Sequence, residues 1–157
     1  MNKDANISTV TRRTFLESTG KAAAAGAVLS QMPIERVAHA TGNDTVNVAL
    51  IGCGGRGTGA VKQALSTEGP VKLVAMADAF RDCLDSSLKS VSAKFKNTPD
   101  RIDVSEDRKF IGQDAYKKAT SLADVVILTT PPGFRPYMFS EAVRQGKNVF
   151  MEKPVAT

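Results

Sequence analysis

A glycine-rich turn is the first feature of this sequence that could bind a ligand. Residues 52–57 read Gly-Cys-Gly-Gly-Arg-Gly and match the pattern G-x-G-x-x-G. They follow a β-branched apolar run, residues 46–51, and precede a segment with helical spacing. In that context we expect Gly52 to permit a tight turn, Gly54 to let the backbone approach a pyrophosphate, and Gly57 to permit close packing of helix on strand. The start of the helix would offer free N–H groups to the phosphates.

An acidic residue at the end of the next apolar run fits the same ligand. Asp78 follows residues 71–77 and lies 21 residues after Gly57, close to the offset of about 20 expected for a carboxylate that binds a ribose. Such a carboxylate accepts hydrogen bonds from ribose hydroxyls and repels a 2′-phosphate, so the expected cofactor is NAD rather than NADP. Arg56 could pair with a phosphate, could partly compensate a 2′-phosphate, or could be solvated. The alternative for the whole pattern is a structural glycine turn with a solvated aspartate.

Alternating strands and helices must position these groups. The apolar runs and turn residues predict strands over 46–51, 71–77, 109–111, 124–130 and 148–151, and helices over 58–66, 81–95, 115–120 and from Pro136 to about Gln145. Apolar strands separated by helices predict an α/β fold with a doubly wound parallel sheet of the Rossmann type. Ligands of such sheets lie at the carboxyl ends of the strands. The later strands here end at residues 130–133 and 152–154.

The composition excludes several other classes of protein. The 157 residues carry a formal charge of +5, two cysteines and one histidine, and this length suits one domain of ordinary size. Two cysteines cannot form a disulfide framework, and the spacings of a Cys/His zinc site are absent, so no metal site is expected. Cys53 is expected to pack at the loop rather than to act as a nucleophile, and Cys83, in the second helix, is expected to be inert as well. The positive charge is scattered, without a run of five Lys/Arg, so no nucleic-acid partner is expected.

The first forty residues have the layout of an export signal. The paired arginines Arg12-Arg13 and then Phe15-Leu16 are followed by a short apolar stretch over 22–29. Small residues at a cleavage site follow, in Ala38-His39-Ala40. The paired arginines resemble a twin-arginine signal, and the apolar stretch is too short for an integral membrane anchor. We therefore predict a signal over 1–40, a dinucleotide-binding domain over 41–157, and a periplasmic or secreted protein. The alternative is an amphipathic helix with a chance arginine pair.

Four segments together resemble the N-terminal domain of the Gfo/Idh/MocA oxidoreductases. They are Ala-Leu-Ile-Gly-Cys-Gly-Gly-Arg-Gly at 49–57, Ala77-Asp78, Thr130-Pro131-Pro132, and Gly-Lys-Asn-Val-Phe-Met-Glu-Lys-Pro at 146–154. The resemblance spans roughly 46–157, and the Glu-Lys-Pro ending is its most specific part. It implies NAD(P)-dependent chemistry on sugars, polyols or related cyclic substrates. Together with the leader, it is similar to the secreted branch of the family.

The resemblance also implies roles for individual residues. Lys153 would lie beside the nicotinamide and the reacting hydroxyl, where its ammonium could polarise a carbonyl or stabilise an alkoxide. The Lys153–Pro154 bond is expected to be cis. The predicted cofactor contacts are Gly52, Gly54, Gly55, Arg56, Gly57, Asp78, Thr130, Pro131, Pro132, Glu152 and Lys153, with Thr130, Pro131 and Pro132 on the nicotinamide side. The alternative for Lys153 is a surface lysine in a strand-end turn. The alternative for Thr130, Pro131 and Pro132 is a plain strand terminator.

Two departures from the family pattern affect the functional hypothesis. Many members carry a histidine where this chain has Arg135, which could hold an anionic group or be solvated. Members also continue into an α/β domain with the substrate pocket, so we expect that this chain lacks the C-terminal substrate domain, is inactive by itself, and forms a homo-oligomer when full length. The leading hypothesis is the cofactor-binding half of an exported oxidoreductase. The alternatives are an NAD-dependent glycoside hydrolase of the same superfamily and a non-catalytic nucleotide-binding module.

Overall fold

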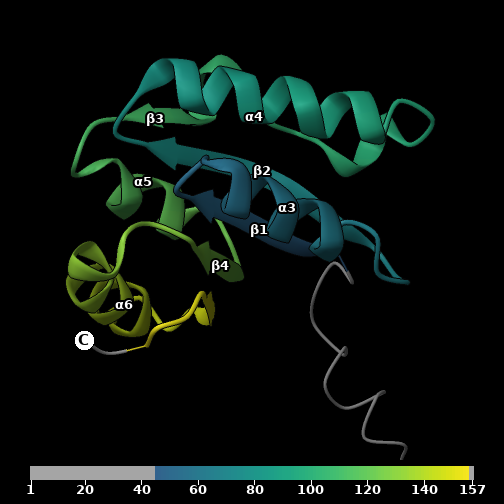
Figure 1. Cartoon of the computed structure of the whole chain (residues 1–157). Coiled ribbons are helices and arrows are strands. Elements are labelled where there is room, and N and C mark those ends of the chain that lie inside the picture. The colour runs from purple at the N-terminus through teal and green to yellow at the C-terminus, as the bar shows by residue number, and fades with distance from the viewer. Residues whose placement is uncertain (1–44, 156–157) are drawn as a thin grey trace, which may run out of the picture. The chain divides into compact units, whose positions relative to one another are not determined.

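A five-stranded parallel sheet organises residues 45–155, which are the residues described by the computed structural model (Figure 1). The strands are β1 (Val46–Ile51), β2 (Val71–Asp78), β3 (Lys109–Ile111), β4 (Val125–Leu128) and β5 (Asn148–Met151). The helices are α3 (Gly55–Ala64), α4 (Arg81–Lys94), α5 (Ala115–Ser121) and α6 (Arg135–Arg144), with short 3₁₀ turns at Pro99–Arg101, Glu106–Arg108 and Pro132–Phe134. The predicted export signal, residues 1–40, lies outside the described residues.

The strand order confirms the predicted doubly wound sheet. The strands lie in the order β3-β2-β1-β4-β5, and each neighbouring pair is parallel. The chain therefore builds outward from β1 through β2 to β3, and then returns across the sheet to place β4 on the other side of β1. This reversal creates a switch point between the carboxyl ends of β1 and β4, which is where doubly wound sheets bind their ligands.

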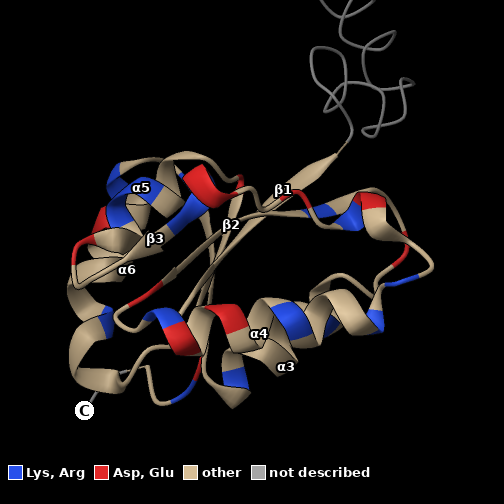
Figure 2. Ribbon diagram, turned by 90° about the horizontal axis from the view of Figure 1, so that it is seen from above, with Lys and Arg blue, Asp and Glu red and all other residues tan. Residues whose placement is uncertain are grey.

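Both faces of the sheet are covered by helices, which explains why the strands are almost continuously apolar. Helices α3 and α4 cover one face, and α5 and α6 cover the other (Figure 2). Alternate residues of β1 point to opposite faces: Val48 and Leu50 pack under α3 and α4, whereas Ala49 and Ile51 pack under α5 and α6. The two cores share this central strand, so β1 is held from both sides just before the glycine motif begins.

The structure corrects the predicted start of α3 and the predicted end of β4. Helix α3 begins at Gly55, inside the glycine motif, three residues before the predicted start at position 58. Its first buried apolar side chain is Ala60, so apolar periodicity could not reveal a first turn made mainly of glycine. Strand β4 ends at Leu128 rather than at residue 130, because the Thr129 side chain turns to hydrogen-bond the chain at the end of β1.

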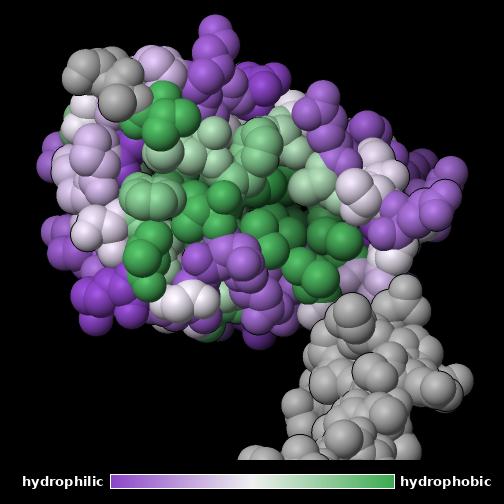
Figure 3. Space-filling view, turned by 90° about the horizontal axis from the view of Figure 1, so that it is seen from below, coloured by the Kyte–Doolittle hydropathy of each residue, from purple (hydrophilic) through white to green (hydrophobic). Residues whose placement is uncertain are grey.

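One side of the molecule leaves apolar side chains exposed. Strand β5 is an edge strand, and Phe150 on it is exposed together with Phe139 and Val143 of α6. Hydrophobic side chains also gather on the surface seen from below, the side on which β4, β5 and α6 lie in Figure 1 (Figure 3). No helix within residues 45–155 has the length and apolar character needed to cross a membrane.

Candidate cofactor site

A cavity of about 730 Å³ opens at the carboxyl ends of the strands, beside the switch point between β1 and β4. Its volume lies in the range typical of ligand-binding pockets, roughly 300–1,000 Å³. The cavity brings together predicted residues from four separate segments of the chain. The predicted residues that line it are Gly52, Gly54, Arg56, Asp78, Thr130, Pro131, Glu152 and Lys153.

Three predicted residues lie outside this cavity. Gly55 opens the first turn of α3 and faces a separate hollow between α3 and α4. Gly57 is buried within α3, and Pro132 begins the 3₁₀ turn after β4. These residues shape the backbone around the cavity without lining it.

Gly52 and Gly57 are required by the close packing of the loop on the sheet. Gly52 has a φ of +93°, a conformation that side chains other than glycine rarely adopt, and a Cβ there would lie 2.8 Å from the amide nitrogen of Thr130. A Cβ on Gly57 would lie 2.5 Å from Thr129 Oγ1 and would overlap the carbonyl oxygen of Gly52. The structure confirms the predicted tight turn at Gly52 and the helix-on-strand packing at Gly57.

The amino end of α3 forms a cradle that an anionic group would fit. Gly54 is the N-cap residue, no side chain caps the helix, and its first turn contains no acidic residue. The amides of this turn therefore keep their hydrogen-bonding capacity and their partial positive charge. A Cβ built on Gly54 would meet no atom within 4 Å, so the missing side chain leaves space above the loop. A pyrophosphate is the kind of group that such a helix start binds.

Asp78 is anchored to the glycine loop by its own carboxylate. Its Oδ2 accepts a hydrogen bond from the amide of Cys53 at 2.6 Å, and its Oδ1 accepts one from the amide of Phe80 at 2.9 Å. These bonds orient the carboxylate toward the loop and keep its negative charge at the wall of the cavity. Each carboxylate oxygen can accept further hydrogen bonds, so a ribose could bind there without displacing the protein partners.

Thr129, Phe80 and Tyr116 are among the residues at the site that the sequence analysis missed. Thr129 Oγ1 lies 2.7 Å from the carbonyl oxygen of Gly52, to which it donates a hydrogen bond, and so ties the end of β4 to the glycine loop. Phe80 and Tyr116 line the cavity, and Phe80 is 65% exposed. The threonine doublet at the end of the predicted strand and an aromatic residue two positions after Asp78 were the available signals.

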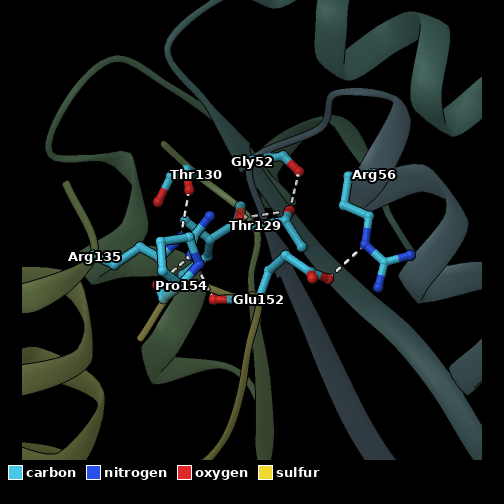
Figure 4. A network of polar contacts seen from close by, with 8 residues as sticks. Gly52, Arg56, Thr129, Thr130, Arg135, Glu152 and Pro154 are labelled. Carbon is cyan, nitrogen blue, oxygen red and sulfur yellow. Dashed lines mark hydrogen bonds and ion pairs between the residues drawn. The ribbon is translucent and has the colours of Figure 1, made fainter. Parts of the chain in front are cut away.

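Arg56 is engaged by a carboxylate from the far side of the cavity. Its Nε lies 2.5 Å from Oε2 of Glu152, which is only 11% exposed (Figure 4). The hydrogen bond from Arg56 lowers the pKa of Glu152 below its ordinary value. None of the three interpretations of Arg56 considered from the sequence included this partner. The pair joins the start of α3 to the segment after β5, two parts of the chain separated by 96 positions.

Arg135 corrects a second expectation. Its side chain was expected to hold an anionic group or to be solvated, but it is only 5% exposed and bonds to backbone carbonyls. Its Nε donates to the carbonyl of Thr130 at 2.5 Å, and its Nη1 donates to the carbonyls of Glu152 and Pro154, the latter at 2.9 Å (Figure 4). The guanidinium thus ties the segment after β4 to the segment after β5.

Lys153 lies between two of the residues that Arg135 binds. It is exposed and lines the cavity, and its side chain forms no hydrogen bond or ion pair with any residue in the described part of the chain. The Lys153–Pro154 peptide bond is cis, as predicted. The ammonium is therefore available to a ligand in the cavity.

The two cysteines are expected to differ in reactivity. Cys53 is 3% exposed, and its burial, with the nearby charge of Asp78, raises the pKa of the thiol. Desolvation and the nearby Asp82 and Asp78 also raise the pKa of Cys83, but Cys83 is partly exposed whereas Cys53 is buried. Since alkylation needs an accessible thiolate, we expect iodoacetamide at pH 8 to alkylate Cys83 at least about ten times faster than Cys53 in the folded chain. Peptide mass spectrometry after timed quenching measures both rates. Faster labelling of Cys53 in folded protein would contradict the buried position of its thiol.

Residues 46–157 match the sequence model of a protein family, which is described as an oxidoreductase family with an NAD-binding Rossmann fold. The chain belongs to the Gfo/Idh/MocA family. This confirms the resemblance on which the predicted roles rest, and it agrees with the parallel sheet and with the position of the cavity.

This Gfo/Idh/MocA domain is similar in sequence to curated proteins named glycosyl hydrolase family 109 proteins. A glycosyl hydrolase family 109 protein of Shewanella pealeana is 32% identical over 162 residues, which cover 92% of this chain and 34% of that protein. A glycosyl hydrolase family 109 protein of Solibacter usitatus is 30% identical over 115 residues, covering 73% of this chain and 25% of that protein. This chain therefore spans about a third or less of the length of these curated relatives.

Solved structures share the fold. The myo-inositol dehydrogenase of Lactobacillus casei, in complex with NAD(H) and myo-inositol, matches with a TM-score of 0.54 and 19% identity, over 71% of this chain and 29% of that one. The scyllo-inositol dehydrogenase of the same organism, with bound NAD(H) and scyllo-inositol, has a TM-score of 0.54 and 22% identity over the same shares.

Proposed function

We propose that this domain binds NAD and forms the cofactor-binding half of an oxidoreductase that acts on a sugar-like or polyol substrate. The observation that carries the proposal is the set of chemical groups that line one cavity. An uncapped helix start with open glycine positions, a carboxylate anchored to the same loop, and the exposed ammonium of Lys153 face the same space. These groups match, in order, the pyrophosphate, the ribose and the reacting end of a nicotinamide dinucleotide.

Each part of the cavity has a proposed task. The first turn of α3 would bind the pyrophosphate, Asp78 would accept hydrogen bonds from the adenine ribose, and Thr130 and Pro131 would line the nicotinamide side. NAD bound there supplies an acceptor for a hydride. Lys153 would donate a hydrogen bond to the substrate oxygen and stabilise the negative charge that develops on it.

Charge favours NAD over NADP in this proposal. The Asp78 carboxylate would repel a 2′-phosphate on the ribose that it binds. Arg56 is the cation in the loop that could offset this repulsion, but its guanidinium is already paired with Glu152. Recruiting Arg56 to a 2′-phosphate would break that ion pair, so its compensation would be incomplete.

A titration tests the proposal. We expect the 157-residue chain to bind NADH, seen as a rise in nicotinamide fluorescence, and to bind NADPH at least about ten times more weakly because of the repulsion at Asp78. Binding of neither dinucleotide by folded protein would contradict the proposal. Equal affinity for both would contradict the role of Asp78 while leaving cofactor binding in place.

The names of the curated relatives favour a second candidate, an NAD-dependent glycoside hydrolase. In such an enzyme, NAD held at this site would supply a hydride acceptor that is regenerated in each cycle, and water would replace the leaving group, so no NADH would accumulate. The full-length protein would therefore release a leaving group from a glycoside without net reduction of NAD, whereas a dehydrogenase would accumulate NADH. If the protein binds NAD but neither releases a leaving group nor accumulates NADH, a non-catalytic nucleotide-binding module would be favoured.

The cellular setting also belongs to the proposal. The pattern in residues 1–40 supports export by the twin-arginine route to the periplasm or the medium, and a folded domain with bound cofactor suits that route. The resemblance supports a homo-oligomer in the full-length protein.

A further inference from the structure

The buried guanidinium of Arg135 connects the two segments that lie on the proposed nicotinamide side of the cavity. One acceptor is the carbonyl of Thr130, in the segment after β4. The other two are the carbonyls of Glu152 and Pro154, the residues on either side of Lys153. A single side chain therefore holds the backbone around the lysine against the segment that would face the nicotinamide.

Among residues 45–155, the hydrogen-bond partners of the Arg135 guanidinium are these three carbonyls. No carboxylate within residues 45–155 lies within ion-pair distance of it, although its side chain is almost completely buried. Burying an unpaired charge is costly unless its hydrogen bonds are well satisfied. The planar fork of an arginine can reach several fixed carbonyls at once, and a lysine ammonium, which is a single point, cannot reproduce that geometry.

We propose that Arg135 is a positioning residue for the nicotinamide half of the cofactor and for Lys153. Arg135 lines the cavity, but its hydrogen bonds go to the backbone of Thr130, Glu152 and Pro154, so it would act through that backbone. The inference rests on the proposed function, since it assigns a task at the same site. It implies that losing Arg135 weakens the binding of the nicotinamide half and spares the binding of the adenosine half, because Asp78 and the start of α3 lie outside its contacts.

The chain provides a matched control for this proposal. Arg101 also binds backbone carbonyls: its Nη1 donates to Leu65 at 2.8 Å and to Thr67 at 3.2 Å, and its Nη2 donates to Gly69 at 3.1 Å. None of these residues lines the cavity. Replacing Arg101 removes a similar network from the opposite end of the strands, so it reports on a purely structural role.

The experiment compares two ligands that differ in the nicotinamide. Wild-type chain, Arg135→Met, Arg135→Lys and Arg101→Met are titrated with NADH and with ADP-ribose by calorimetry. We expect Arg135→Met to weaken NADH binding about ten-fold and to change ADP-ribose binding less than about two-fold, with a smaller loss of NADH binding in Arg135→Lys. Arg101→Met should lower the melting temperature without changing the ratio of the two affinities.

Several results would overturn the inference. They are an equal loss for both ligands in Arg135→Met, no loss for either, or equal affinity of the wild-type chain for NADH and ADP-ribose. If Arg135→Met does not fold, the positioning role of Arg135 is tested with Arg135→Lys and with an NMR measurement on the wild-type chain. The Nε–H signal of Arg135 should exchange slowly with solvent and shift with NADH but not with ADP-ribose, and absence of that difference overturns the proposal. Failure of the wild-type chain to bind either ligand would instead refute the proposed function.

Discussion

Replacing Gly57 by alanine is expected to lower the free energy of unfolding by about 3 kcal/mol or more. The added Cβ would overlap the carbonyl oxygen of Gly52 and lie 2.5 Å from Thr129 Oγ1. That carbonyl cannot easily move, since it accepts the hydrogen bond from Thr129, and the Gly52 amide donates to Ala77 at 2.9 Å. Relieving the overlap would therefore separate α3 from both β1 and β4. Urea unfolding followed by circular dichroism measures the change.

Gly59→Ala is the matched control, two positions further along the same helix. A Cβ on Gly59 would meet nothing within 4 Å, and alanine favours a helix interior over glycine by up to about 1 kcal/mol. We therefore expect this variant to be as stable as the wild-type chain or more stable. If the two variants unfolded at the same urea concentration, the close packing of the loop on the sheet would not be the reason for glycine at position 57.

Replacing Asp78 by alanine is expected to weaken NADH binding by about ten- to a hundred-fold, the range that corresponds to losing a hydrogen bond to a charged group. NADPH binding should fall less or rise, because the charge that repels the 2′-phosphate is removed together with the ribose contact. The preference for NADH over NADPH should therefore narrow. Fluorescence titration of both cofactors measures the two affinities separately.

Two further variants separate the causes. Asp78→Asn keeps an acceptor oxygen near the Cys53 amide but removes the negative charge, so we expect it to raise NADPH affinity while costing less NADH affinity than alanine does. Asp100→Ala removes an exposed carboxylate from the 3₁₀ turn at Pro99–Arg101, outside the cavity, and should change neither affinity. Unchanged NADH binding in Asp78→Ala would exclude Asp78 as the ribose ligand.

Much of the fold follows from local patterns in the chain. Apolar runs of strand length, separated by segments of helical period, predict a parallel sheet covered on both faces. The five predicted strands all occur, and they lie in a doubly wound order. The glycine motif and Asp78 were found because each is defined by its distance along the sequence from a strand end. The predicted start of α3 differs from the observed one because the helix carries no buried apolar side chain before Ala60.

The sequence by itself determined that the chain forms a Rossmann-type sheet, that residues 46–157 match the Gfo/Idh/MocA family, and which strand ends meet at the ligand edge. Only the tertiary structure decided how the polar side chains there are paired. Arg56 meets Glu152 across 96 positions, Thr129 meets Gly52 across 77, and Arg135 turns inward to backbone carbonyls. The physical reason is that periodicity and spacing are local properties of the chain. Contacts between side chains of distant segments exist only once the strand order and the helix packing have set the distances between them.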